Sequence, residues 1–223
     1  MTHTLHRLGN TKNLGGDFVV FAMSAKGINE NGSAQALCKF LEIALEYDPI
    51  NMGDMKTGNI LKTSKEEIFN KIQDVSIVHA VFSKEEKVAA LLNHLKKADL
   101  GVSVVVSGLF DRVKAVGESA GLKQHTMECS AGIWGKMEKL PPAETLQITT
   151  MCGHGMVTAN LVAHYVKQIK FGKITTAEAA KKLAEPCECG VFNIERAEKL
   201  LQAIVENDFK PTLLKEGQTS MPG

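Results

Sequence analysis

The chain lacks an excess of basic residues and has few aromatic side chains. Its 26 Lys and Arg residues are balanced by 25 Asp and Glu residues, which leaves a net charge of +1, and aromatic residues make up 5%. Nucleic-acid binding needs clustered positive charge for phosphates and aromatic platforms for unpaired bases. The Lys pairs at 96–97 and 181–182 fall on amphipathic helical patterns, as is typical of solvated faces. We therefore expect no nucleic-acid partner.

Long hydrophobic runs and the glycine motifs of nucleotide sites are also missing. The apolar stretch Val102–Val106 has the size of a strand and is far shorter than a bilayer span. The polar residues 1–13 show no secretory pattern. No Gly-x-Gly-x-x-Gly follows a strand pattern, and no Walker-type phosphate loop occurs. These absences predict a cytoplasmic protein without membrane contact and without a standard nucleotide site.

The chain has enough apolar sequence for a real core. Its 223 residues are 44% hydrophobic and 23% charged, which is ordinary for a globular protein. We expect four parts: an N-terminal arm over 1–14, an α/β domain over 15–150, a helical metal-site region over 151–210 packed on that domain, and a flexible tail over 211–223.

Strand and helix patterns alternate through the first half of the chain. β-branched apolar runs predict strands at 17–23, 75–82 and 102–106, and apolar spacings of three and four residues predict helices after each of them. This alternation is typical of an α/β fold. We expect a three-layer parallel or mixed sheet with helices on both faces. Two further strands are predicted at 122–133 and 145–150, followed by a mostly helical, cysteine-containing part.

The five cysteines are an odd number, and in a reducing compartment they indicate thiols or metal ligands rather than disulfides. Cys38 falls on the apolar face of the predicted helix 33–46 and is expected in the core. The other four lie in the C-terminal half, where we look for the chemistry.

Cys152 lies in the segment Thr149–Gly155 (TTMCGHG), which we place between a strand and a helix. Free N–H groups and the dipole at the start of that helix would favour a thiolate. Gly153 and Gly155 allow a sharp turn, and His154 could pair with the thiolate. The alternative is a tight turn with an inert cysteine.

The string Met151–Gly155 (MCGHG) resembles the first active-site motif of the proline racemase and hydroxyproline epimerase family. In that family such a cysteine opens a helix and is one of two thiol acid/base groups, which implies carbon-acid chemistry for Cys152. The second motif of the family is of the Cys-Gly-x-Gly type, and Cys187–Gly190 (CECG) does not reproduce it. The resemblance covers five residues, and we do not assign the chain to the family.

Cys187 and Cys189 form a Cys-x-Cys pair in a loop between two predicted helices. This spacing is tighter than that of most zinc sites, whereas iron–sulfur clusters often combine local thiolates with a distant one. Cys152 is the distant candidate. Cys129, on the predicted strand 122–133, is either a fourth metal ligand or a small core residue. For the local pair, a redox-active dithiol and an accidental surface pair are the alternatives.

We therefore expect a metalloprotein, and first of all an iron–sulfur enzyme with a 4Fe-4S cluster bound by Cys152, Cys187 and Cys189. Three thiolates leave one iron of such a cluster open, and an open metal position acts as a Lewis acid. The expected reaction is of the lyase class: elimination, dehydration or group removal on a small polar molecule.

The remaining catalytic candidates are His154 and His125 for proton transfer and Lys26 as an anchor for an anionic substrate. Lys26 follows a predicted strand, as do Asp111 and Arg112, and ligands of parallel sheets bind beyond the carboxyl ends of the strands. Loop polarity without function is the alternative for each of these three residues.

Two other functions stay open. One is metal-free acid/base or nucleophilic catalysis of the isomerase or racemase kind, centred on Cys152 and His154. The other is a structural zinc module or binding protein. A homo-oligomer is compatible with the sequence, and nothing in it identifies the substrate.

Overall fold

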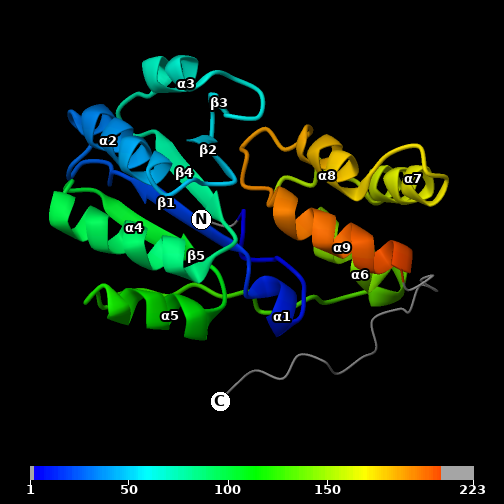
Figure 1. The fold of residues 1–223 in the computed structure, drawn as a ribbon. Helices are drawn as coiled ribbons and strands as arrows, with labels where there is room; N and C mark the ends of the chain where they lie inside the picture. Colours follow the sequence, from blue (N-terminus) through cyan, green and yellow to red (C-terminus); the bar gives the residue numbers. More distant parts are fainter. Residues whose placement is uncertain (1–2, 207–223) are drawn as a thin grey trace.

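The computed structural model describes residues 3–206, and its centre is a five-stranded sheet with the strand order β3-β2-β4-β1-β5 (Figure 1). The predicted tail at 211–223 and the end of the helical region at 207–210 lie outside the described residues. The strands are β1 (Phe18–Met23), β2 (Asn51–Asp54), β3 (Gly58–Asn59), β4 (Ile77–Phe82) and β5 (Ser103–Ser107).

All neighbouring strands in this sheet are antiparallel, so the predicted parallel arrangement is wrong. Phe18 at the start of β1 lies opposite Phe82 at the end of β4, and β5 and β2 are likewise antiparallel to their neighbours. The helical connections do join strands of the same direction: β1 with β2, β3 with β4, and β4 with β5. An antiparallel strand lies between the members of each such pair. The alternation of strands and helices therefore predicted that strands joined by a helix run in the same direction. It did not predict which strands are neighbours in the sheet.

One face of the sheet packs against the helices of the first half of the chain. Phe18, Val20 and Ala22 of β1 join the buried residues of these helices in one apolar cluster. The helices of this layer are α2 (Ser33–Leu45), α3 (Lys65–Lys71), α4 (Glu85–Ala98) and α5 (Phe110–Ser119), whereas the short α1 (Thr11–Leu14) contributes no residue to the cluster.

The opposite face packs against the C-terminal helices (Figure 1). Val19 and Phe21 of β1 and Val81 of β4 join the buried residues of these helices in a second apolar cluster. The elements of this half are the 3₁₀ turn η1 (Met137–Lys139) and the helices α6 (Ala143–Thr149), α7 (Ala159–Lys170), α8 (Thr176–Ala184) and α9 (Ile194–Glu206). Because successive strand residues point to opposite faces, the wholly apolar β1 fills both clusters.

Local capping signals were largely informative. Thr175 and Glu178 form a capping box at α8, and the Ser64 side chain accepts from the N–H of Glu67 at α3. At α4 the N-cap is Lys84, which makes no side-chain capping bond, and the hydroxyl of the preceding Ser83 donates to Glu195.

Two predicted strands are wrong. Residues 122–133 contain no strand, and most of them are exposed. Residues 145–150 lie in or directly after α6, whose first turn follows Pro142. The β-branched composition suggested a strand there, but Leu146 and Ile148 are buried in a helical conformation, and Ile148 packs into the C-terminal helical layer. Across residues 3–206, no helix has both the length and the apolarity needed to cross a membrane.

Candidate functional site

Three cysteines from two distant segments meet in the apolar cluster under the C-terminal helices. Cys152 lies in the turn after α6, and Cys187 and Cys189 lie in the loop between α8 and α9. All three are buried, with exposed fractions of 2%, 1% and 0%. The Sγ atoms of Cys187 and Cys189 are 3.8 Å apart, and the Cys152 thiol is hydrogen-bonded to Cys187. The structure thus brings together three of the four predicted metal ligands.

Backbone N–H groups point at each of these sulfurs. Those of His154 and Met156 contact the Cys152 sulfur and partly offset the rise in the pKa of that thiol that the Cys187 hydrogen bond and burial cause. The N–H groups of Phe192 and Val191 act in the same way on the pKa values of the Cys187 and Cys189 thiols. Hydrogen bonds to sulfur stabilise the charged form. These N–H groups therefore favour negative sulfur, as hydrogen-bond donors around metal-binding thiolates do, although burial and the neighbouring thiols still raise the pKa values of Cys152 and Cys187.

The hydrogen bonds between the three thiols shift their pKa values in different directions. The hydrogen bond from Cys187, followed by weaker effects, lowers the pKa of Cys189. The hydrogen bond from Cys152 lowers the pKa of Cys187, but its own bond to Cys189 and its burial outweigh this and raise that pKa to about 11. The hydrogen bond to Cys187 and burial strongly raise the pKa of Cys152. Of the three, Cys189 is therefore the thiol whose ionisation its neighbours favour.

The predicted position of Cys152 at the start of a helix is wrong. Its N–H bonds the carbonyl oxygen of Thr149 at the end of α6, and α7 begins only at Ala159. The positive end of a helix dipole therefore does not support this thiolate. The neighbouring Gly153 has another purpose: a Cβ there would lie 2.2 Å from the backbone oxygen of His3, so the N-terminal arm crosses the turn at this point.

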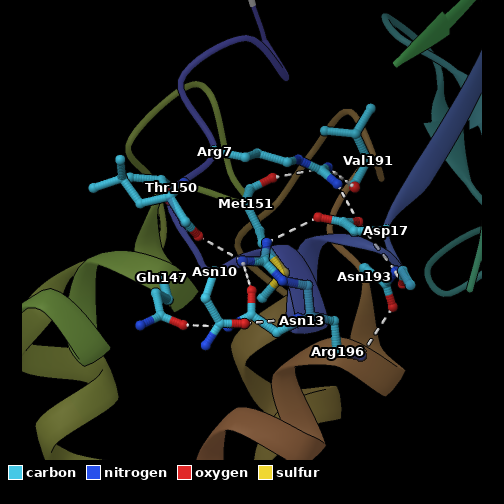
Figure 2. A network of polar contacts seen from close by, with 12 residues as sticks. Arg7, Asn10, Asn13, Asp17, Gln147, Thr150, Met151, Val191, Asn193 and Arg196 are labelled. Carbon is cyan, nitrogen blue, oxygen red and sulfur yellow. Dashed lines mark hydrogen bonds and ion pairs between the residues drawn. The ribbon is translucent and has the colours of Figure 1, made fainter. Parts of the chain in front are cut away.

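Arg7, in the same arm, connects the two cysteine segments (Figure 2). Its guanidinium donates to the backbone oxygen of Met151, at 3.3 Å, and to that of Val191, and it forms an ion pair with Asp17. Met151 precedes Cys152, and Val191 follows the Cys-x-Cys loop. The charge of Arg7 also contributes to the lowered pKa of Cys189, after the hydrogen bonds of that thiol. A side chain from the predicted loose arm is thus part of the site.

Asp17 is the centre of this polar network. Besides Arg7 it accepts from Arg196 of α9 at 2.8 Å and from Asn193 at 3.1 Å, and its side chain is fully buried (Figure 2). Asn193 also caps α9 through the N–H of Arg196. Our sequence reasoning missed the network. The available signals were an Asp directly before an apolar strand and an Arg beside the apolar stripe of α9.

The loop with Cys187 and Cys189 is also held from the sheet. The Asn51 amide donates to the backbone oxygen of Gly190 at 2.8 Å, and the Asn59 amide donates to that of Glu188 at 3.1 Å. Glu188 further pairs with Lys62. The cysteine loop is therefore attached to the edge formed by β2 and β3.

His79 of β4 lies fully buried on the same face of the sheet. Burial lowers its pKa to about 4, although the backbones of Gly190 and Gly53 favour the charged ring. Neither ring nitrogen makes a hydrogen bond of good geometry. His79 therefore stays neutral near pH 7.

The other predicted site residues do not join the thiols. His154 is exposed, and its Nε2 lies 2.9 Å from Nε2 of His3. His125 and Cys129 are exposed in the irregular segment 122–133. Lys26 follows the carboxyl end of β1, whereas Asp17 and the thiol centre are at its amino end.

The expected anion pocket at the strand ends is also wrong for a topological reason. β1 and β5 run antiparallel, so their carboxyl ends lie at opposite ends of the strand pair. Lys26, which follows β1, and Asp111, which follows β5, therefore do not converge. Arg112 instead pairs with Glu85 at 3.0 Å.

Comparisons with known proteins identify no relative. No family model, no curated protein and no solved structure matches this chain. Within residues 3–206, no group of three or more His, Cys, Asp and Glu side chains is arranged around a common metal position. As they stand, the three thiols are hydrogen-bonded to one another. Metal binding would replace these protons, because only the thiolate is a ligand.

Proposed function

We propose that Cys152, Cys187 and Cys189 bind a thiophilic metal centre that fastens the turn after α6 to the loop between α8 and α9. The observation that carries this proposal is the meeting of three buried sulfurs from two distant segments, each of which receives a backbone N–H. Apolar packing alone does not need donors aimed at sulfur. A set of thiolates does, because buried negative charge has to be compensated.

The spacing of the sulfurs favours a single ion. Zinc–sulfur bonds are about 2.3 Å long, and a tetrahedral arrangement then separates neighbouring sulfurs by about 3.8 Å. The Cys187 and Cys189 sulfurs have this separation, 3.8 Å. Structural zinc sites have four protein ligands, so an ion held by these three buried thiolates would take its fourth ligand from another group. We therefore place a single zinc-like ion first.

The iron–sulfur enzyme is the second candidate. It is favoured by the number of thiolates: three converge, and Cys129 lies in the exposed segment 122–133. Three thiolates on a four-iron cluster leave one iron open for a small polar substrate. Of the predicted catalytic residues, only His154 is next to the centre in the chain, so it is the one that would serve such an iron.

Elemental analysis separates the two candidates. The full chain, purified without oxygen and without chelator, should contain close to one equivalent of zinc and no acid-labile sulfide. A brown protein with iron and labile sulfide would instead establish the second candidate. A chain with neither metal after growth with both supplied, and with no affinity for added Zn²⁺ or Co²⁺, would refute the metal centre.

Single substitutions identify the ligands. Cys152→Ser, Cys187→Ser and Cys189→Ser should each weaken metal binding by more than about 100-fold, which exceeds the usual effect of an outer-shell change. Cys38→Ser is the matched control, because this half-buried thiol lies in α2 and packs on the opposite face of the sheet. Binding that is unchanged in the three variants, or lost in the control, would contradict the assignment.

A further inference from the structure

The two edges of the sheet are protected to different degrees. β3 at one edge has only two residues, and short edge strands are a common protection against pairing with other chains. β5 at the other edge has five residues, Ser103–Ser107, without charge, proline or bulge. In the described part of the chain, no strand pairs with the outer side of β5.

The side chains of β5 are unusually open for an apolar strand. Val104 and Val105 are 38% and 39% exposed, although they point to opposite faces of the sheet. Both valines lie on the edge strand, and no further strand in the described part of the chain flanks its outer side. A long, apolar, uncharged edge is a site for strand pairing unless a partner covers it.

The sequence of β5 is the same in both directions, Ser-Val-Val-Val-Ser. When two such strands pair antiparallel about Val105, each valine meets a valine, and Ser103 of one copy lies opposite Ser107 of the other. Cross-strand pairs of β-branched residues stabilise a sheet. A two-fold interface requires this kind of self-complementary surface.

In the same two-fold arrangement, the charges on α5, the helix after β5, would complement those on α5 of the second copy. The exposed Lys114 and Arg112, the latter already paired with Glu85, lie in its amino-terminal half, and Glu118 lies in its carboxyl-terminal half. When two copies of α5 run antiparallel about a two-fold axis, basic halves face acidic halves. Asp111 at the first turn reduces the contrast without reversing it.

From these observations we infer that two copies of this chain pair through their β5 edges, antiparallel about Val105, to form one continuous sheet. The partner at this edge is a second copy rather than an unrelated protein. The β5 sequence is the same in both directions, and the two halves of α5 carry opposite charges, so each element complements an antiparallel copy of itself. This assignment does not depend on the proposed metal centre, which lies in the cluster under the C-terminal helices.

Sedimentation of the full chain tests the association. We expect a species of twice the 24.2 kDa chain mass at micromolar concentration. Val105→Lys places two like charges beside the two-fold axis and should weaken dimerisation by at least about 100-fold. Val105→Thr, which keeps a β-branched side chain, is the matched control and should remain dimeric. A chain that is monomeric at all concentrations, or a dimer that Val105→Lys leaves intact, would overturn the inference.

Crosslinking tests the register and remains decisive if Val105→Lys fails to fold. In a Cys129→Ser background, which removes the exposed native thiol, Val105→Cys should form an intermolecular disulfide under mild oxidation. The two Cα atoms at the axis would be about 4.5–5.5 Å apart, within disulfide range. Ser103→Cys should not crosslink, because its two copies would be displaced by about 13 Å along the strands. Efficient crosslinking at 103 rather than 105, read by mass spectrometry of the joined peptides, would refute this register.

Discussion

The guanidinium of Arg7 lies against the carboxylate of Asp17, and both side chains are buried, with exposed fractions of 6% and 0%. This ion pair joins the N-terminal arm to the start of β1, and Arg7 continues to the backbone on both sides of the thiol centre. The pair therefore connects the stability of the fold with the geometry of the three cysteines.

Removing the Asp17 carboxylate should be strongly destabilising. Asp17→Ala leaves the buried Arg7 and Arg196 without their counter-charge, and breaking a buried pair in this way costs about 3–5 kcal/mol. Urea unfolding should show a lower midpoint with an unchanged slope. Glu42→Gln, which breaks the exposed pair with Lys39, is the control and should leave the midpoint unchanged. Equal stability of the Asp17 variant and the wild type would mean that the network contributes nothing.

Loosening the cysteine loop should expose its thiols. Asn51→Leu removes the donor to the Gly190 carbonyl and leaves that buried oxygen unpaired, at a cost of about 1–3 kcal/mol. Metal-free protein should then react faster with iodoacetamide at Cys187 and Cys189. Lys62→Gln, which loses only the partly exposed pair with Glu188, should have a smaller effect. Labelling rates that do not differ between these variants would show that Asn51 does not hold the loop.

The ionisation of Cys189 should depend on its two neighbours to different degrees. Cys187→Ala removes the hydrogen bond that contributes most to the lowered pKa of Cys189, so this pKa should rise. Arg7→Gln should raise the pKa of Cys189 less, because the Arg7 charge is a weaker cause. Ultraviolet titration of the thiolate in metal-free protein measures both shifts. A larger pKa shift for Arg7→Gln than for Cys187→Ala would mean that the charge of Arg7, and not the hydrogen bond from Cys187, is the stronger influence on Cys189.

Acid should destabilise the fold through His79. Because burial lowers the folded-state pKa of His79 to about 4, the unfolded chain binds a proton that the folded chain does not as the pH falls below 6.5. This contribution to the free energy of unfolding is fully present above pH 6.5. It decreases between pH 6.5 and 4, and the total loss is about 3 kcal/mol. His79→Gln should flatten the pH dependence of unfolding in this window. If the two profiles stay parallel there, His79 is not the titrating group.

The amino-acid sequence carried most of the local structure. Apolar runs located β1, β4 and β5, and the spacing of apolar residues located α2, α4 and α7, because periodicity reports which side of an element is buried. The same kind of signal failed at 145–150, where the tertiary packing of α6 overrode the β-branched composition.

The candidate site was predictable only in part. The residue types at Cys152, Cys187 and Cys189 indicated shared chemistry, since paired and glycine-flanked thiols are uncommon in an inert surface. The contributions of Arg7 and Asp17 were not visible, because their partners other than each other lie more than a hundred residues away in sequence and only folding brings them near.

By itself, the sequence determined most of the helices, the principal strands and the identity of the thiols, which depend on interactions between residues a few positions apart. Only the tertiary structure decided that neighbouring strands run antiparallel, that Cys152 meets the Cys187 and Cys189 loop, and that Lys26 is at the far end of β1 from them. These relationships depend on which distant surfaces bury each other. That choice is set by the packing of the whole chain, and no local pattern encodes it.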